Sequence, residues 1–131
     1  MSMSSDGAQF THRDTPPIYR LKAEFFKMLG HPARVRILEL LKEGEQSVGA
    51  LQAELGLDSS GTSQHLTAMR RMGLLESRRE GTSVFYRVAD ARMFKLLETA
   101  RQVLTSQLEQ TRDLLGDLEA EPASATSRRR R

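Results

Sequence analysis

Apolar residues recur every three or four positions in five stretches of the chain, and this spacing predicts five helices. We expect helices at residues 16–29, at 32–43, from after Ser47 to Leu55, from after Asp58, and from about residue 90 to 118. A glycine follows each of the first four, where a left-handed residue would end the helix: Gly30, Gly44, Gly56 and Gly73. The chain is therefore predicted to be mainly α-helical.

The helix that follows Asp58 has two unlike faces. Thr62, Leu66 and Met69 recur at i, i+4 and i+7, so they mark the side that packs inward. The other side carries small or amide-bearing residues and then a cation: Ser59, Ser60, Ser63, Gln64, Thr67 and Arg70. Short donors and acceptors followed by positive charge suit a helix that enters a DNA major groove. The alternative is a plain amphipathic surface helix, which would more often carry Glu and Lys there.

A predicted β-hairpin follows this helix directly. Residues 74–79 and 84–88 read as strands, and the polar turn at 80–83 contains a glycine. Arg78, Arg79 and Arg87 make the hairpin basic, and Thr82 and Ser83 place hydroxyl groups at its tip. Such a tip suits contact with phosphate or the minor groove beside the major-groove helix. An exposed hairpin with arginines for solubility is the alternative.

The order of short motifs from residue 18 to about 105 resembles an ArsR/SmtB-type winged-helix repressor. The motifs are LGHPARVRILELL at 29–41, SVGAL at 47–51, the pattern of Ser60, Ser63, His65 and Leu66, then GLL at 73–75, REG at 79–81 and YR at 86–87. Their order and spacing are specific, whereas each motif alone is weak. The resemblance implies a homodimeric bacterial repressor. Such a repressor binds an imperfect palindrome and releases it when an inducer, often a metal ion, binds.

These observations predict one mainly α domain with a small β-hairpin, a winged helix-turn-helix, at residues 15–118. Residues 1–14 are polar and are expected to form a flexible N-terminal arm. Residues 119–131 are rich in Ala and Ser and end in four arginines, so we expect a disordered basic tail.

The last predicted helix is longer than a domain of this size needs. Its apolar positions are spaced by three or four and form a seam for another helix: Met93, Leu97, Ala100, Leu104 and Leu108, continued by Thr111, Leu115 and Leu118. Ile18, Leu21 and Phe25 offer a second apolar surface on the first helix. We expect a homodimer formed through the first and last helices. The alternative is that both helices only cover the core of one monomer.

Positive charge is concentrated where DNA contact is predicted. The whole chain has a formal net charge of +3, and residues 128–131 alone supply four positive charges. Residues 59–88 contain five arginines and two glutamates, whereas residues 89–121 contain four basic and seven acidic residues. The helix-turn-helix and hairpin are therefore basic, which favours release of counterions from DNA.

The sequence lacks the ligands of the metal sites that the resemblance implies. Thiolate sensors of that family carry cysteines on the third helix, and this chain has none. The family's other site uses Asp and His of the last helix; Asp90 matches the carboxylate, but Arg92 stands near the histidine position. His12, His31 and His65 lack ligand spacing. We expect His65 to be packed and hydrogen-bonded and His31 to begin a helix. An atypical site with His12 and carboxylates stays open, but we predict no metal and no cofactor.

Other function classes have little support. The chain shows no phosphate loop, no plausible catalytic triad and no paired carboxylates in an apolar setting, so we predict no catalytic residues and no enzyme. Long apolar runs, a signal sequence and cysteines are all absent, which favours a cytoplasmic protein without membrane contact. A winged helix that binds a protein or RNA remains the main alternative.

We therefore predict a dimeric, sequence-specific repressor of an operator in double-stranded DNA. Its regulation is left to a small-molecule inducer, a partner protein, modification or expression level alone. Ser59, Ser60, Ser63 and Gln64 are expected to read base edges or neighbouring phosphates. The backbone and wing contacts are assigned to Thr67, Arg70, Arg78, Arg79, Thr82 and Ser83.

Overall fold

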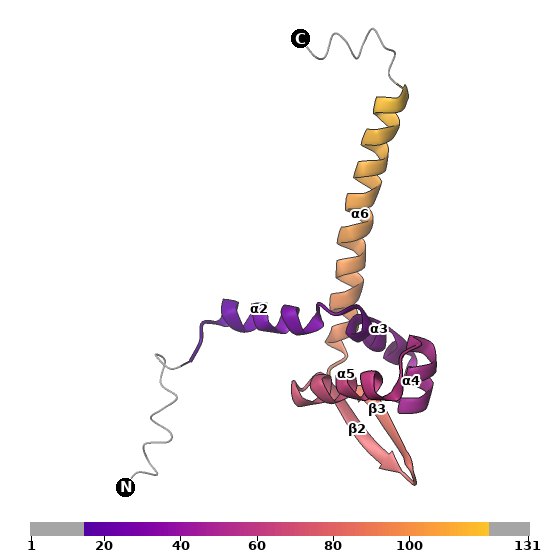
Figure 1. The fold of residues 1–131 in the computed structure, drawn as a ribbon. Helices are drawn as coiled ribbons and strands as arrows, with labels where there is room; N and C mark the ends of the chain where they lie inside the picture. Colours follow the sequence, from indigo (N-terminus) through magenta and orange to yellow (C-terminus); the bar gives the residue numbers. More distant parts are fainter. Residues whose placement is uncertain (1–14, 121–131) are drawn as a thin grey trace. The chain divides into compact units, whose positions relative to one another are not determined.

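The computed structural model describes residues 15–120, and Figure 1 shows their secondary structure. Within the described residues, 15–90 form one compact unit and 91–120 belong to a second. The predicted arm at 1–14 lies outside the described residues, as do residues 121–131 of the predicted tail.

The first unit contains four α-helices, a 3-10 turn and three short strands among its described residues (Figure 1). In chain order they are α2 (Ile18–Leu29), α3 (Pro32–Leu40), η1 (Leu41–Glu43), β1 (Gln46–Ser47), α4 (Val48–Leu55), α5 (Ser59–Arg71), β2 (Leu75–Glu80) and β3 (Ser83–Val88). Every helix predicted for this part of the chain is present. The first begins two residues later than expected, because Pro17 occupies the N-cap position instead of the first turn.

Side chains predicted to begin helices do so. Ser47 Oγ accepts a hydrogen bond from the Ala50 amide at 3.1 Å, and Asp58 Oδ1 accepts one from the Gly61 amide at 2.6 Å. His31 Nδ1 accepts from the Ala33 amide at 3.2 Å and so caps α3. The first turn of α5, where we predict base contacts, is therefore fixed by the carboxylate that precedes it.

The prediction that four glycines end helices in the left-handed conformation is wrong at Gly30. Its φ is −74°, whereas the φ of Gly44, Gly56 and Gly73 is positive. The break between α2 and α3 comes one residue later, at His31, which is extended with φ −109° and ψ 124°. A residue before proline is confined to this extended region, so the step into α3 does not require a left-handed glycine.

The core lies beneath α5 and the sheet. The side chains with the least exposure come from α3, α4, α5 and β2: Ile37, Leu38, Leu51, Thr62, Leu66, Met69 and Leu75. Thr62, Leu66 and Met69 are the predicted inward face of α5, so that prediction is confirmed. The Thr62 hydroxyl donates to the Asp58 carbonyl at 2.9 Å, which satisfies the one buried polar side chain of this face.

The sheet has three strands, one more than the predicted hairpin. Its order is β1-β3-β2, and all pairs are antiparallel. The hairpin is present, and Gly81 takes a positive φ of 62° in its two-residue turn. Strand β1 was missed because its two residues are too short for any periodicity. It pairs Gln46 with Tyr86 and Ser47 with Phe85, and so joins the hairpin to the segment before α4.

The second unit is the long helix α6 (Arg92–Ala120), which has 29 residues. The predicted helix ended at residue 118, so Glu119 and Ala120 belong to the helix and not to the tail. Along its predicted apolar seam Met93 is buried, but Leu104 and Leu108 are 58% and 67% exposed. On α2, Ile18 and Leu21 are also exposed, and Phe25 is half-buried. None of the described helices is long and apolar enough to span a membrane.

Candidate nucleic-acid interface

The exposed side of α5 carries the polar residues that the sequence predicted. Ser59, Ser60, Ser63 and Gln64 are exposed, and Thr67 is half-buried. A shallow groove of about 410 Å³ follows this side, lined by Ser60, Ser63, Gln64, Thr67, Ala68 and Arg71. The structure therefore brings four of the predicted residues together in one continuous strip.

Arg71 belongs to this strip but was absent from the predicted site. It follows Ser60, Gln64 and Thr67 by eleven, seven and four residues, so all four lie on one helical stripe. That spacing is a signal in the sequence that would have found it. Arg70, the predicted cation, lies instead toward the wing.

A second groove, of about 310 Å³, lies between the end of α5 and the wing. Its lining residues are Arg70, Ser77, Arg78, Arg79, Val84 and Tyr86. Arg70 and Arg79 thus approach one groove from a helix and from a strand. Guanidinium groups with a neighbouring hydroxyl are the groups that bind phosphate oxygens in protein–DNA contacts. Thr82 in the turn and Ser83 at the start of β3 are both exposed at the tip of the wing, as predicted. The turn itself is only residues 81–82, because Glu80 and Ser83, expected in the turn, pair as the last residue of β2 and the first of β3.

The pairing of β2 with β3 separates the wing arginines by face. Cross-strand partners share a face, and successive residues alternate. Ser77 and Arg79 therefore share a face with their partners Tyr86 and Val84. Arg78 shares the opposite face with Phe85, and Arg87 faces Glu76 there. We call these the inner face, which includes buried Tyr86, and the outer face of the wing.

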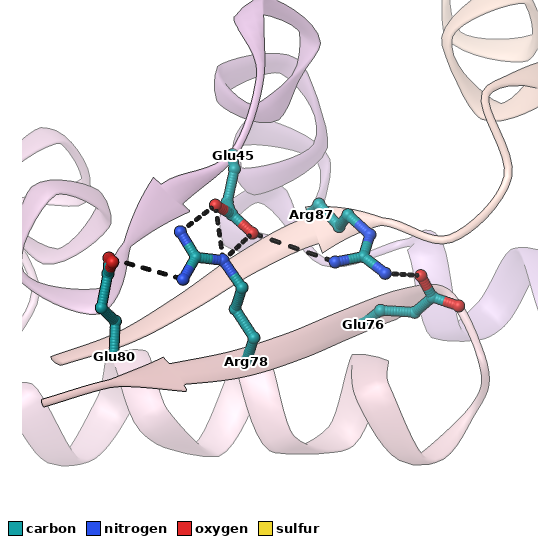
Figure 2. Close-up of polar contacts among 5 residues, drawn as sticks. All are labelled: Glu45, Glu76, Arg78, Glu80 and Arg87. Carbon is teal, nitrogen blue, oxygen red and sulfur yellow. Dashed lines mark hydrogen bonds and ion pairs between the residues drawn. The ribbon is translucent and has the colours of Figure 1, made fainter.

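The outer face holds a network of ion pairs, which Figure 2 shows. Arg78 Nε donates to both oxygens of Glu45 at 2.9 Å, and Arg78 Nη2 lies 2.7 Å from Glu45 Oε1. Arg78 Nη1 also lies 3.4 Å from Glu80. Arg87 lies 3.9 Å from the second Glu45 oxygen and 2.8 Å from Glu76. The five side chains carry a formal net charge of −1.

The charges in this network reinforce one another. The hydrogen bond from Arg78 lowers the pKa of the Glu45 carboxyl, and the positive charges of Arg78 and Arg87 lower it further. The same hydrogen bond and the Glu45 and Glu80 charges raise the pKa of Arg78. The Arg78 guanidinium also lies over the Phe85 ring, 4.7 Å from its centroid. Arg78 is thus held by a carboxylate, a second acid and an aromatic ring.

Arg70, Arg71 and Arg79 differ from this pair. Within residues 15–120, no carboxylate lies at ion-pair distance from any of the three. Their charge is therefore not neutralised by the described part of the chain. Of the predicted basic contacts, the structure leaves Arg70 and Arg79 unpaired and ties Arg78 into the outer-face network.

His65 lies on the side of α5 that faces the start of α3. Its ring is 4.3 Å from the His31 ring, centroid to centroid, and its Nδ1 accepts from Arg34 Nε at 3.2 Å. Burial lowers the pKa of His65, and the neighbouring His31 and Arg34 lower it further. The expectation that His65 is packed and hydrogen-bonded is confirmed, as is the role of His31 at the start of a helix.

The described residues do not supply a metal centre. Among residues 15–120, no group of three or more His, Cys, Asp or Glu side chains is placed to hold an ion. His12, the residue of the atypical site that stayed open, lies outside this range.

The elements α4, α5, β2 and β3, in this order, define a winged helix-turn-helix. Residues 31–77 match the sequence profile of the family described as bacterial regulatory protein, arsR family. The chain is 47% identical over 108 residues to the uncharacterized HTH-type transcriptional regulator Rv0081 of Mycobacterium tuberculosis strain H37Rv. That alignment covers 82% of this chain and 95% of the relative. The chain therefore belongs to the arsR family of bacterial regulatory proteins and is a transcriptional regulator of the helix-turn-helix type.

Solved structures agree with this assignment. The crystal structure of Rv0081 matches with a TM-score of 0.69 at 48% identity, over 74% of this chain and 98% of that one. The homodimeric winged helix-turn-helix DNA-binding domain Mb0332 of Mycobacterium bovis, solved by NMR, gives 0.63 at 33% identity, over 71% and 86%. The transcriptional repressor BigR of Xylella fastidiosa gives 0.61 at 32% identity, over 72% and 96%.

Proposed function

We propose that this protein is a sequence-specific repressor that binds an imperfect palindromic operator in double-stranded DNA as a homodimer. The observation that carries the proposal is the polar strip of α5, flanked by arginines that no described carboxylate neutralises. A major-groove helix needs short polar side chains toward the bases and cations toward the phosphates. Repressors are among the similar proteins, as the name of BigR states.

The proposed DNA contacts fall into two groups, base contacts from the start of α5 and backbone contacts from its later residues and the wing. Ser59, Ser60, Ser63 and Gln64, in its first two turns, read base edges or adjacent phosphates. Backbone and wing contacts come from Thr67, Arg70, Arg71, Arg79, Thr82 and Ser83. The proposal keeps nine of the ten residues predicted from the sequence and adds Arg71. Arg78 receives a different role below, because Glu45 holds its guanidinium.

A second copy of the chain is proposed to cover the exposed apolar residues of α2 and α6. The predicted seam on α6 consists of Met93, Leu97, Ala100, Leu104 and Leu108, and α2 contributes Ile18, Leu21 and Phe25. Met93 is already buried, and Leu97 and Phe25 are half-buried, so the surface left to be covered is mainly that of the other five. Exposed leucines spaced at helical intervals indicate a helix partner. Mb0332, a similar protein, is described as homodimeric. Two-fold symmetry would place two α5 helices about 34 Å apart, in successive major grooves.

The proposed regulator is a small molecule or a partner protein, and not a metal ion. The sequence has no cysteine for a thiolate site, and Arg92 stands near the histidine position of the family's other site. Binding of the promoter fragment in the presence of a panel of divalent metals checks this. We expect no metal to change the affinity; a metal-dependent release would contradict this part of the proposal.

Footprinting on the DNA upstream of the protein's own gene tests the proposed function. We expect one protected site with two related half-sites about one helical turn apart. Gln110→Ala, on exposed α6, serves as a control that leaves the footprint unchanged. Absence of any preference for duplex DNA would contradict the proposal and favour a winged helix that binds another protein.

A further inference from the structure

Glu45 is the shared partner of both outer-face arginines. Strand β1 pairs Gln46 with Tyr86, so Glu45, one residue earlier, lies opposite Arg87 on the central strand. Glu76 lies opposite Arg87 on the other side. A row of acid, base and acid therefore crosses the sheet, and Arg78 joins it diagonally through Glu45 (Figure 2).

The contacts of Arg78 are stronger than those of an ordinary surface ion pair. An isolated exposed pair contributes little, because water screens it and two long side chains lose freedom. Here three contacts of 2.7–2.9 Å join Arg78 to one carboxylate, and the Phe85 ring lies beneath the guanidinium. The Glu45 side chain is only 27% exposed, the lowest value among the five side chains of the network.

We propose that Glu45 is a positioning residue that holds Arg78 and Arg87 on the outer face of the wing and withholds them from DNA phosphates. The inference rests on the proposed DNA-binding function. Phosphate contacts add affinity for every sequence alike and carry no base information. Cations free on both faces of the wing would strengthen binding to random DNA. By confining free charge to Arg70, Arg71 and Arg79, Glu45 keeps non-specific binding low.

Glu45→Gln tests the proposal because it removes the charge and keeps the size of the side chain. Binding of the full-length protein to a labelled random-sequence duplex and to the upstream fragment is measured over a range of NaCl concentrations. We expect the slope of log K against log salt to steepen by about 0.9 for each arginine that reaches a phosphate. Affinity for the random duplex should rise severalfold at low salt, and affinity for the upstream fragment should rise by a similar factor, because phosphate contacts do not depend on sequence.

Glu43→Gln is the matched control, since it removes the same charge two residues earlier and Glu43 has no ion-pair partner among residues 15–120. We expect it to leave the slope near the wild-type value. Glu45→Gln combined with Arg78→Gln should lose the part of the steepening that Arg78 supplies. Equal slopes for Glu45→Gln and Glu43→Gln would overturn the proposal. So would equal losses on both duplexes for Glu45→Gln, which would make Glu45 only a brace for the sheet.

Two further readouts keep the test decisive. If Glu45→Gln does not fold, Arg78→Gln alone decides: we expect an unchanged slope, and a slope that falls by about 0.9 would mean that Arg78 already contacts phosphate. The wild-type protein separates the two proposals. If it fails to bind either duplex, the proposed function is wrong; if it binds and the variants show equal slopes, only the role of Glu45 is wrong.

Discussion

The two faces of the wing use arginine in opposite ways. Arg78 and Arg79 are neighbours on β2, but Arg78 contacts Glu45, Glu80 and Phe85, whereas Arg79 has no carboxylate partner in the described chain. Strand alternation places the two side chains on opposite faces of the wing. A count of basic residues treats the two as equal, and only the pairing of β1 with β3 shows that they are not. The useful charge of a DNA-binding surface is thus the charge left over after internal pairing.

The largest expected effect is a loss of folding stability when the core beneath α5 and the sheet is disrupted. Leu66 lies on the inward face of α5 and is fully buried. Leu66→Ala should therefore lower the free energy of unfolding by about 2–5 kcal/mol, through lost apolar burial and the cavity left behind. Urea denaturation measures this. Met72→Ala, at a residue that is 50% exposed, is the control and should cost less than about 1 kcal/mol. Similar losses for both variants would show that α5 does not rest on this core.

A smaller effect is expected on DNA affinity when a proposed base-reading side chain without charge is removed. Gln64 lies in the polar strip of α5 and has no charge, so Gln64→Ala should weaken operator binding by about 1–3 kcal/mol and leave random-duplex binding unchanged. Competition binding with the two duplexes gives both values. Equal losses on operator and random DNA would show that Gln64 does not read a base.

The smallest expected effect is on the pH dependence of folding stability. It involves His65, on the side of α5 that faces the start of α3. The folded protein has the lower His65 pKa, so the unfolded chain takes up the proton first as pH falls. Stability should therefore be intact above about pH 6.5 and decline below it toward the folded-state pKa. His65→Asn keeps an acceptor for Arg34 and cannot titrate, so thermal melts from pH 7.5 to 5 should show less decline than wild type. Equal declines in the two proteins would contradict the assignment.

Periodicity predicted the helices well because α3, α4 and α5 each pack apolar side chains into the core. The apolar positions of α2 and α6 keep the same helical spacing, although several of them are exposed. The same argument found Thr62, Leu66 and Met69, and capping chemistry found Ser47 and Asp58. It failed at Gly30, where the constraint from Pro32 on His31 determines the turn instead. It also missed β1, since a two-residue strand has no pattern of its own and exists only through its partner β3.

The candidate site could be predicted only in part from the sequence, because some of its contacts join residues that are far apart along the chain. Ser60, Ser63 and Gln64 share a helix face by local spacing, so the sequence is sufficient to group them. The state of Arg78 depends on Glu45, which is 33 residues away in sequence and reaches it only through the sheet. Long-range pairing of this kind leaves no local signal.

The salt dependence of duplex binding by Arg79→Gln and Arg78→Gln, measured side by side with wild type, shows whether the two faces of the wing differ in their contact with DNA. The two variants remove the same charge from adjacent positions of one strand. We predict that Arg79→Gln lowers the magnitude of the slope by about 0.9 and that Arg78→Gln leaves it near the wild-type value. Equal reductions in the two variants would contradict the account, since both arginines would then contact DNA and the outer-face network would not withhold charge.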